Sequence, residues 1–185
     1  VADDRTQRER NDAIIEAFNA NGGRAVWHPI AASPEDRTEV MVWKHVGTVP
    51  RESRLTPLFQ LRGLSKLLVY NFYTRDSDLA GIDQMEDLPG LLIRGQITDE
   101  GLRHLSDAKS LRKLWIYGTK VRGHGLRHLQ HLDQLELLWI DGELSDEGIA
   151  ELKRMTHLKH LHVDHAGYEV GEILEKSLPD TEVVY

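Results

Sequence analysis

The chain has 185 residues, enough for one well-buried domain, and carries 23 Lys and Arg against 30 Asp and Glu, for a net charge of -7. This acidic balance argues against a general binder of the phosphate backbone, which would present a positive surface, so no nucleic-acid partner is expected. The absence of cysteine excludes disulfides, thiolate metal sites and a cysteine nucleophile.

The compartment of the protein is left open by the sequence. No apolar run approaches the roughly 18 residues that span a bilayer, so no membrane span is predicted. The first residue is Val1 rather than Met, which indicates a trimmed or processed chain that a signal peptide or lipid anchor could precede. Cytoplasmic and exported locations are therefore both open.

Residues 1–63 are predicted to form an N-terminal cap and lead-in segment. Apolar residues at helical spacing predict a helix over 6–20, ended by a pair of glycines. Alternating residues predict strands over 24–28 and 39–46, with a loop over 31–37 between them. Such a cap would cover the apolar end of a repeat array, and a separate functional domain is the less favoured alternative because about 50 residues bury little surface.

From residue 64 to residue 185 the sequence repeats itself. The copies start at Leu64, Leu88, Leu111, Leu135 and Leu158, and a truncated copy starts at Thr181. Subtracting successive full starts gives spacings of 24, 23, 24 and 23 residues. A near-fixed period predicts a solenoid, because stacked copies bury an apolar face that no single copy could bury alone.

Each copy is predicted to be a strand followed by a helix. The first half alternates with a period of two, so that pairs such as Leu114 and Ile116 point into the core. The second half has helical spacing, as at Leu126, Leu129 and Leu132. Repetition of this unit predicts an α/β fold with a parallel sheet inside and helices outside.

Two stretches between strand and helix are nearly alike, Ile97-Thr98-Asp99-Glu100-Gly101-Leu102 and Leu144-Ser145-Asp146-Glu147-Gly148-Ile149. A hydroxyl followed by carboxylates is typical of helix starts, so these acids are predicted to be structural. With these residues the chain resembles the short bacterial copies of the leucine-rich repeat family, closely over 64–185 and loosely over 39–63. The resemblance implies a right-handed arc with the sheet on the concave side, helices on the convex side, and a partner bound on the concave side.

The chain departs from this family at the position after each strand, where the family commonly has a buried Asn or Cys. The residues at these places are Phe72, Gln96, Thr119, Glu143 and Ala166. Only Gln96 and Thr119 could repeat the backbone hydrogen bonding of a buried Asn. Irregular turns are therefore expected, with Glu143 turned to solvent because an unpaired buried carboxylate is costly.

The strand residues between the buried positions are predicted to face the concave side, one from each strand in a column. The first column holds Leu68, Leu92, Trp115, Trp139 and His162, the second Tyr70, Arg94, Tyr117, Asp141 and Asp164, and the third Lys66, Gly90, Lys113, Leu137 and His160. Met41 and Trp43 would extend the first column if their strand joined the sheet in register.

An exposed line of large apolar and aromatic residues predicts a non-enzymatic module that binds a protein or peptide. The candidate binding residues are Leu68, Tyr70, Leu92, Arg94, Lys113, Trp115, Tyr117, Trp139, Asp141, His162 and Asp164. Positive residues lie toward the N-terminal end of this face and acidic residues toward the other, which would orient a partner. A purely structural aromatic ladder in a scaffold component stays open, and a polysaccharide is the weaker alternative ligand.

The last repeat suggests a different class of function. His160, His162, Asp164 and the neighbouring Asp141 carry donors that could hold zinc or another transition metal, in a metal-binding or metal-dependent protein. Strand residues two apart are separated by roughly 6.6 to 7 Å, so convergence on one ion demands favourable rotamers. The sequence contains no recognised catalytic motif, and we expect no cofactor and no catalytic residues.

The C-terminal strand at residues 183–185 carries a further prediction. Its unpaired backbone groups could pair with a second copy of the chain, because a free sheet edge invites pairing. An edge-strand homodimer is therefore a possible oligomeric state.

Overall fold

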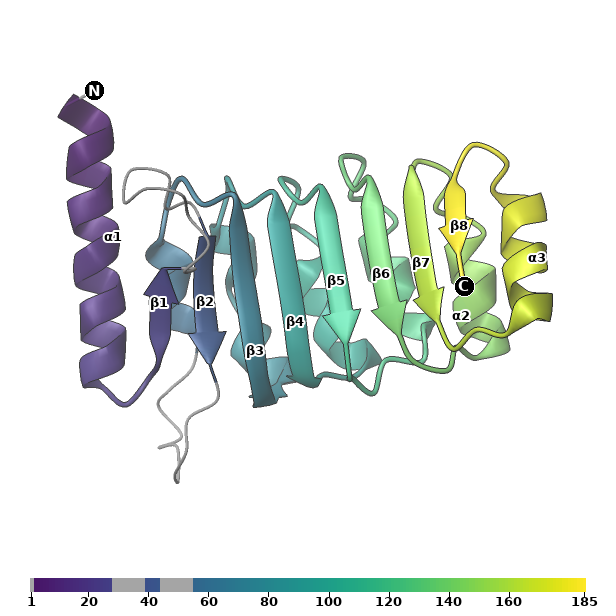
Figure 1. The fold of residues 1–185 in the computed structure, drawn as a ribbon, viewed down its shortest axis with the longest axis horizontal. Helices are drawn as coiled ribbons and strands as arrows, with labels where there is room; N and C mark the ends of the chain where they lie inside the picture. The colour runs from purple at the N-terminus through teal and green to yellow at the C-terminus, as the bar shows by residue number, and fades with distance from the viewer. Residues whose placement is uncertain (1, 28–38, 44–54) are drawn as a thin grey trace.

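The computed structural model describes residues 2–27, 39–43 and 55–185. Eight strands within these residues form one open sheet in which neighbours follow each other in chain order from β1 to β8 (Figure 1). β1 is antiparallel to β2, and every later pair of neighbours is parallel. The loop predicted over 31–37 and the end of the strand predicted over 39–46 lie outside the described residues.

The strands are β1 (Ala25–Trp27), β2 (Glu39–Trp43), β3 (Lys66–Arg75), β4 (Gly90–Gln96), β5 (Lys113–Tyr117), β6 (Leu137–Asp141), β7 (His160–Asp164) and β8 (Glu182–Val184). The α-helices are α1 (Ala2–Ala20), α2 (Asp146–Leu152) and α3 (Tyr168–Ser177). The 3-10 helices are η2 (Thr56–Gln60), η3 (Asp76–Leu79), η4 (Ile82–Gln84), η5 (Asp99–Leu105) and η6 (His124–Leu129). Within the described residues no helix is long and apolar enough to cross a membrane.

The register of the parallel strands follows the sequence repeat. Leu91 pairs with Leu114, Leu114 with Leu138, and Leu138 with Leu161, so equivalent residues of successive copies lie side by side. A shift of one residue would have turned every apolar side chain to the other face of the sheet. The predicted period is therefore confirmed by the pairing of the strands.

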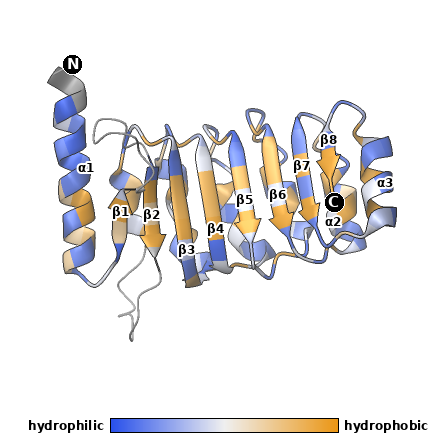
Figure 2. Ribbon diagram, in the orientation of Figure 1, coloured by the Kyte–Doolittle hydropathy of each residue, from blue (hydrophilic) through white to orange (hydrophobic). Residues whose placement is uncertain are grey.

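One face of the sheet packs against the helices and forms the core. Inward strand residues such as Leu114 and Ile116 belong to one buried cluster with helix residues such as Leu126 and Leu129. This cluster runs without interruption from α1 to Leu178. Figure 1 shows the short helices behind the sheet, and Figure 2 shows the apolar residues concentrated along the strands.

Several of the helices that follow the strands are 3-10 helices rather than α-helices. These are η3, η5 and η6, whereas only α2 and α3 are α-helical. The apolar residues of η5 and the turn after it are spaced three apart, at Leu102, Leu105 and Ala108, and all are buried. A 3-10 helix has three residues per turn, so this spacing places all of them on one line facing the core.

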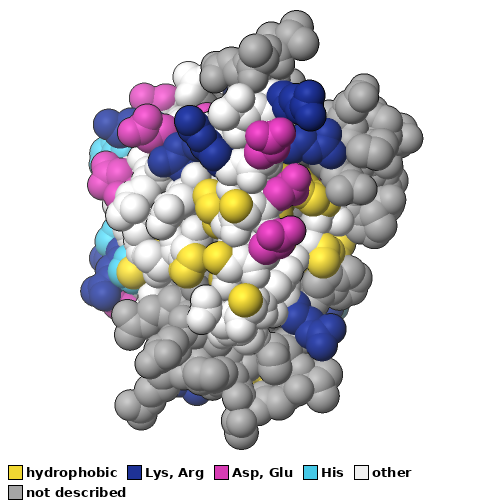
Figure 3. Space-filling view, turned by 90° about the vertical axis from the view of Figure 1, so that its left-hand side faces the viewer, with side chains coloured by type: hydrophobic (Ala, Val, Ile, Leu, Met, Phe, Trp, Pro, Cys, Tyr) yellow, Lys and Arg dark blue, Asp and Glu magenta, His cyan; other side chains and the backbone are white. Residues whose placement is uncertain are grey.

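Helix α1 is hydrogen-bonded to β1 and to the segment between η2 and β3. The Trp27 indole Nε1 donates to Asp12 Oδ1 at 2.6 Å, and the Asn11 side chain donates to the Arg62 carbonyl at 2.8 Å. α1 lies beside β1 at the end of the sheet (Figure 1), and the surface at this end mixes charged and apolar side chains (Figure 3). The predicted helix is confirmed and begins earlier than expected, at Ala2.

Strand β2 joins the sheet parallel to β3 and corrects one expectation. Met41 pairs with Leu68 and so extends the first column. Trp43 pairs with Tyr70 and extends the second column, so its assignment to the first column was wrong. Residues that lie two positions apart on one strand share a face of the sheet but belong to different columns.

The turns after the strands are irregular, as expected. The register shifts between Tyr70 and Arg75 at the end of β3. Glu143 is exposed and lies 3.7 Å from Arg122, which confirms that its carboxylate is in solvent. Gln96 is also exposed, so it does not take the place of a buried Asn, contrary to expectation.

Two aspartates, of which Asp99 is buried and Asp76 is half-buried, accept backbone hydrogen bonds like those that a buried Asn would accept. Asp99 is 7% exposed and accepts hydrogen bonds from the backbone N–H groups of Arg122, Gly123 and Gly125 at 2.9, 2.8 and 2.8 Å. One copy earlier, Asp76 accepts from the Thr98 backbone N–H and hydroxyl at 2.8 and 2.7 Å. Each carboxylate thus ties its own copy to the next one.

Candidate binding surface

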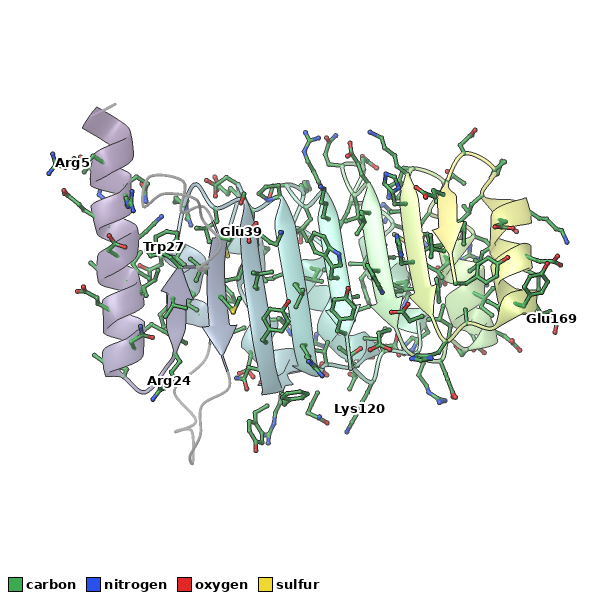
Figure 4. All side chains as sticks on the ribbon, in the orientation of Figure 1. Arg5, Arg24, Trp27, Glu39, Lys120 and Glu169 are labelled. Carbon is green, nitrogen blue, oxygen red and sulfur yellow. The ribbon has the colours of Figure 1, made fainter. Side chains whose placement is uncertain are left out.

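The sheet face that turns away from the helices carries the three predicted columns, and we call it the front face. It is the face toward the viewer in Figures 1 and 4. The register brings Leu92 beside Trp115, Trp115 beside Trp139, and Trp139 beside His162, as the alternation predicted. The candidate binding residues of β3 to β7 therefore do lie on one continuous surface.

The N-terminal half of the front face has a small apolar cluster of its own. Met41, Leu68 and Leu92 are 6, 5 and 6% exposed, and Tyr70, Trp115 and Tyr117 pack against them. The expectation that Leu68 and Leu92 stand exposed is therefore wrong. The packing of these three aromatic side chains removes apolar surface from water and so contributes to stability.

The centre of the front face is a run of contacting rings. The Tyr117 and Trp139 ring centroids are 5.5 Å apart with the planes tilted by 58°, and the Trp139 and His162 rings stack at 4.4 Å and 17°. At the other side of the run, Lys66 Nζ lies 5.4 Å from the centroid of the Trp115 ring. All of these rings are half-buried, so part of each remains open to a partner.

The four candidate metal ligands are each engaged with a neighbouring residue, and two of them share Trp139. His160 Nδ1 lies 2.8 Å from Glu182 Oε2, and the His162 ring stacks on Trp139. Asp164 Oδ2 accepts from Trp139 Nε1 at 2.6 Å, and Asp141 Oδ2 accepts from the Gly118 backbone N–H at 3.2 Å. Across residues 2–27, 39–43 and 55–185, no group of three or more metal-binding side chains converges.

Sequence reasoning missed the interaction between Arg94 and Phe72. The Arg94 guanidinium carbon lies 4.3 Å from the centroid of the Phe72 ring, which is 45% exposed. The buried Nε of Arg94 has no hydrogen-bond partner within the described part of the chain. The available signal was Phe72, a large aromatic residue in the copy that precedes Arg94, because the repeat brings neighbouring copies side by side.

Tyr117 sits where the apolar and acidic parts of the front face meet. Burial, together with the smaller effects of the nearby Asp164, Tyr70 and Asp141, raises the pKa of Tyr117 to about 12. The hydroxyl therefore remains a neutral donor and acceptor well above physiological pH.

We predict that Tyr117 ionises late in a spectrophotometric titration of the folded protein. Because its pKa is higher in the folded chain than the ordinary value of 10.0, its stabilising contribution is complete below about pH 10 and is lost as the pH rises toward about 12. Tyr117→Phe should remove the tyrosinate absorbance that appears near pH 12. The free energy of unfolding of this variant should also fall less between about pH 10 and about pH 12. Removal of an absorbance step centred near pH 10 instead would contradict this assignment.

The chain matches no family model and no curated protein sequence. Among solved structures it is similar to an internalin from Listeria monocytogenes, with 22% identity over 70% of this chain and a TM-score of 0.47. The matched part spans 43% of that internalin chain.

Proposed function

We propose that the chain is a leucine-rich repeat solenoid that binds a protein or peptide on the front face and is not an enzyme. The observation that carries the proposal is the run of half-buried rings at Trp115, Tyr117, Trp139 and His162. Trp and Tyr are the residues most enriched at binding hot spots, where a large rigid surface is desolvated at small entropic cost. In this proposal the front face is the concave side, and residues 1–63 cap the array.

The ring contacts also favour one alternative, a structural ladder in a scaffold component. The stacking of Trp139 on His162 and its hydrogen bond to Asp164 stabilise the sheet whether or not a partner binds. The metal-binding alternative has no comparable observation in its favour. The edge-strand homodimer stays a prediction, and α3 lies next to β8 at that end of the sheet (Figure 1).

Replacing both Trp115 and Trp139 with alanine should abolish partner capture while the chain stays folded. Removal of two hot-spot rings typically costs 2 kcal/mol or more of binding free energy, roughly a 30-fold loss of affinity. The measurement is affinity capture from native extract followed by titration of the captured partner, with circular dichroism to confirm folding.

A matched control is Tyr168→Ala on α3, since Tyr168 is 72% exposed and lies off the front face. This variant should capture the partner as the parent chain does. Unchanged capture by the Trp115 and Trp139 double variant would leave only the structural ladder.

A further inference from the structure

The front face is polarised by charge, and its two ends differ in how their charges are satisfied. We propose that it recognises an extended partner segment carrying an acidic residue and a basic residue four positions apart, with an apolar residue midway. This inference rests on the proposed function and names its ligand. The acidic residue binds Arg94 and the basic residue binds Asp164.

Arg94 is prepared to bind a carboxylate. Its guanidinium lies on the Phe72 ring, and no hydrogen bond or ion pair joins it to another described residue. Gly118 leaves space beside it, since a Cβ built at that glycine would lie 3.7 Å from Arg94 Nε. A stacked guanidinium has its fork of N–H donors already oriented, which suits two parallel hydrogen bonds to a carboxylate.

Lys66 is less suited to this role although it lies on the same face. Its Nζ is 3.0 Å from Glu39 Oε1, so its charge is already neutralised. Lys113 is exposed at the rim of the face, in the third column. A rim charge chiefly speeds association, whereas a partly buried cation without a counter-ion gains most from a partner's carboxylate.

At the acidic end, no Lys or Arg of the described part of the chain forms an ion pair with Asp141 or Asp164. Asp164 accepts its hydrogen bond from the neutral indole of Trp139, and Asp141 accepts from the neutral backbone N–H of Gly118. The nearest basic group is His165, whose Nε2 lies 3.6 Å from Asp141 Oδ1. Both carboxylates are half-buried and have lone pairs left to accept from a Lys or Arg of a partner.

The spacing of the two ends sets the spacing of the ligand. Arg94, Tyr117, Asp141 and Asp164 occupy equivalent positions on β4, β5, β6 and β7. Three inter-strand steps of about 4.8 Å separate Arg94 from Asp164 by roughly 14 Å. Residues four apart in an extended segment are about 13 Å apart and point to the same side, as does the residue midway. That middle side chain then lies over Tyr117 and Trp139.

The test is a selection of random displayed peptides on the folded full chain. We expect enriched peptides to carry Asp or Glu four positions from Lys or Arg. Synthetic copies of these peptides should bind Arg94→Gln at least tenfold more weakly. The double variant Arg94→Glu with Asp164→Lys should prefer the same peptides with their two charges exchanged.

The chain offers a matched control for the charge exchange. Glu172 and Lys176 form an ion pair at 3.4 Å on α3, away from the front face. Exchanging these two charges should leave the selected peptides unchanged.

The outcomes separate this inference from the function on which it rests. Enriched peptides that require Trp115 and Trp139 but lack the charge pair, or that bind Arg94→Gln unchanged, overturn the inference and leave the proposed function standing. A selection that enriches no peptide dependent on Trp115 and Trp139 overturns both.

Discussion

Replacing Asp99 with alanine should lower the free energy of unfolding by about 3 kcal/mol, because buried backbone N–H groups would lose their acceptor. The N–H groups of Gly123 and Gly125 are buried with this carboxylate, and each is 2.8 Å from Asp99 Oδ1. Urea denaturation of the variant measures the loss directly.

Two further variants make the Asp99 experiment specific. Asp99→Asn keeps one acceptor oxygen but turns an amide donor toward the same N–H groups, so it should fall between the parent and the alanine variant. Asp83→Ala removes an exposed carboxylate from η4 and should change stability by no more than about 0.5 kcal/mol. A loss below about 1 kcal/mol for Asp99→Ala would show that the carboxylate is not needed to hold the turn.

Replacing Gly125 with alanine should destabilise the same turn by a comparable amount, about 3 kcal/mol. A Cβ built at Gly125 would lie 2.3 Å from the Asp99 carbonyl oxygen and 2.8 Å from the Asp99 carbonyl carbon. These are backbone atoms of the preceding copy, so relief requires the two copies to move apart. For a chain of this size such a loss lowers the melting temperature by roughly 6 to 12 °C, which thermal unfolding would detect.

A suitable comparison for Gly125 is Gly81, at the start of η4. Its φ of 91° and ψ of 5° are left-handed, but the nearest atom to an added Cβ is the flexible end of Gln84, at 3.2 Å. Gly81→Ala should therefore cost only the left-handed strain of about 1 to 2 kcal/mol. If Gly81→Ala proved as damaging as Gly125→Ala, the close approach of successive copies would not be the cause.

The core and the strand order could be predicted from the sequence because both depend on spacing alone. A fixed period of 23 or 24 residues places equivalent residues side by side, as Leu114 and Leu138 show. Alternation then decides which side chains point to the core and which to the front face. The composition of the front face was therefore predictable residue by residue.

The state of each front-face side chain was decided only by the tertiary structure. Leu68 and Leu92 are buried in a cluster with Met41, against which Tyr70, Trp115 and Tyr117 pack. Arg94 lies on Phe72, which comes from β3, and Asp164 accepts from Trp139, which comes from β6. Along the chain, Arg94 is 22 residues from Phe72, and Asp164 is 25 residues from Trp139. The rotamers that bring each pair together depend on the space that the adjacent copy leaves for the side chains.

The repeat thus determined where the front-face side chains lie, and the packing between copies determined which of them have polar groups without a partner in the described residues. In the sequence, Asp99 stands in a pattern that is typical of a helix start. In the structure, its carboxylate also accepts hydrogen bonds from the backbone N–H groups of Gly123 and Gly125 in the next copy. His160, His162, Asp164 and the neighbouring Asp141 are residue types typical of a metal site, yet each contacts a neighbouring residue and they do not converge on one point in the described residues. Spacing along the chain specifies which column a residue joins. Hydrogen bonds and ring contacts form between side chains of different strands, and only the folded structure brings those atoms together.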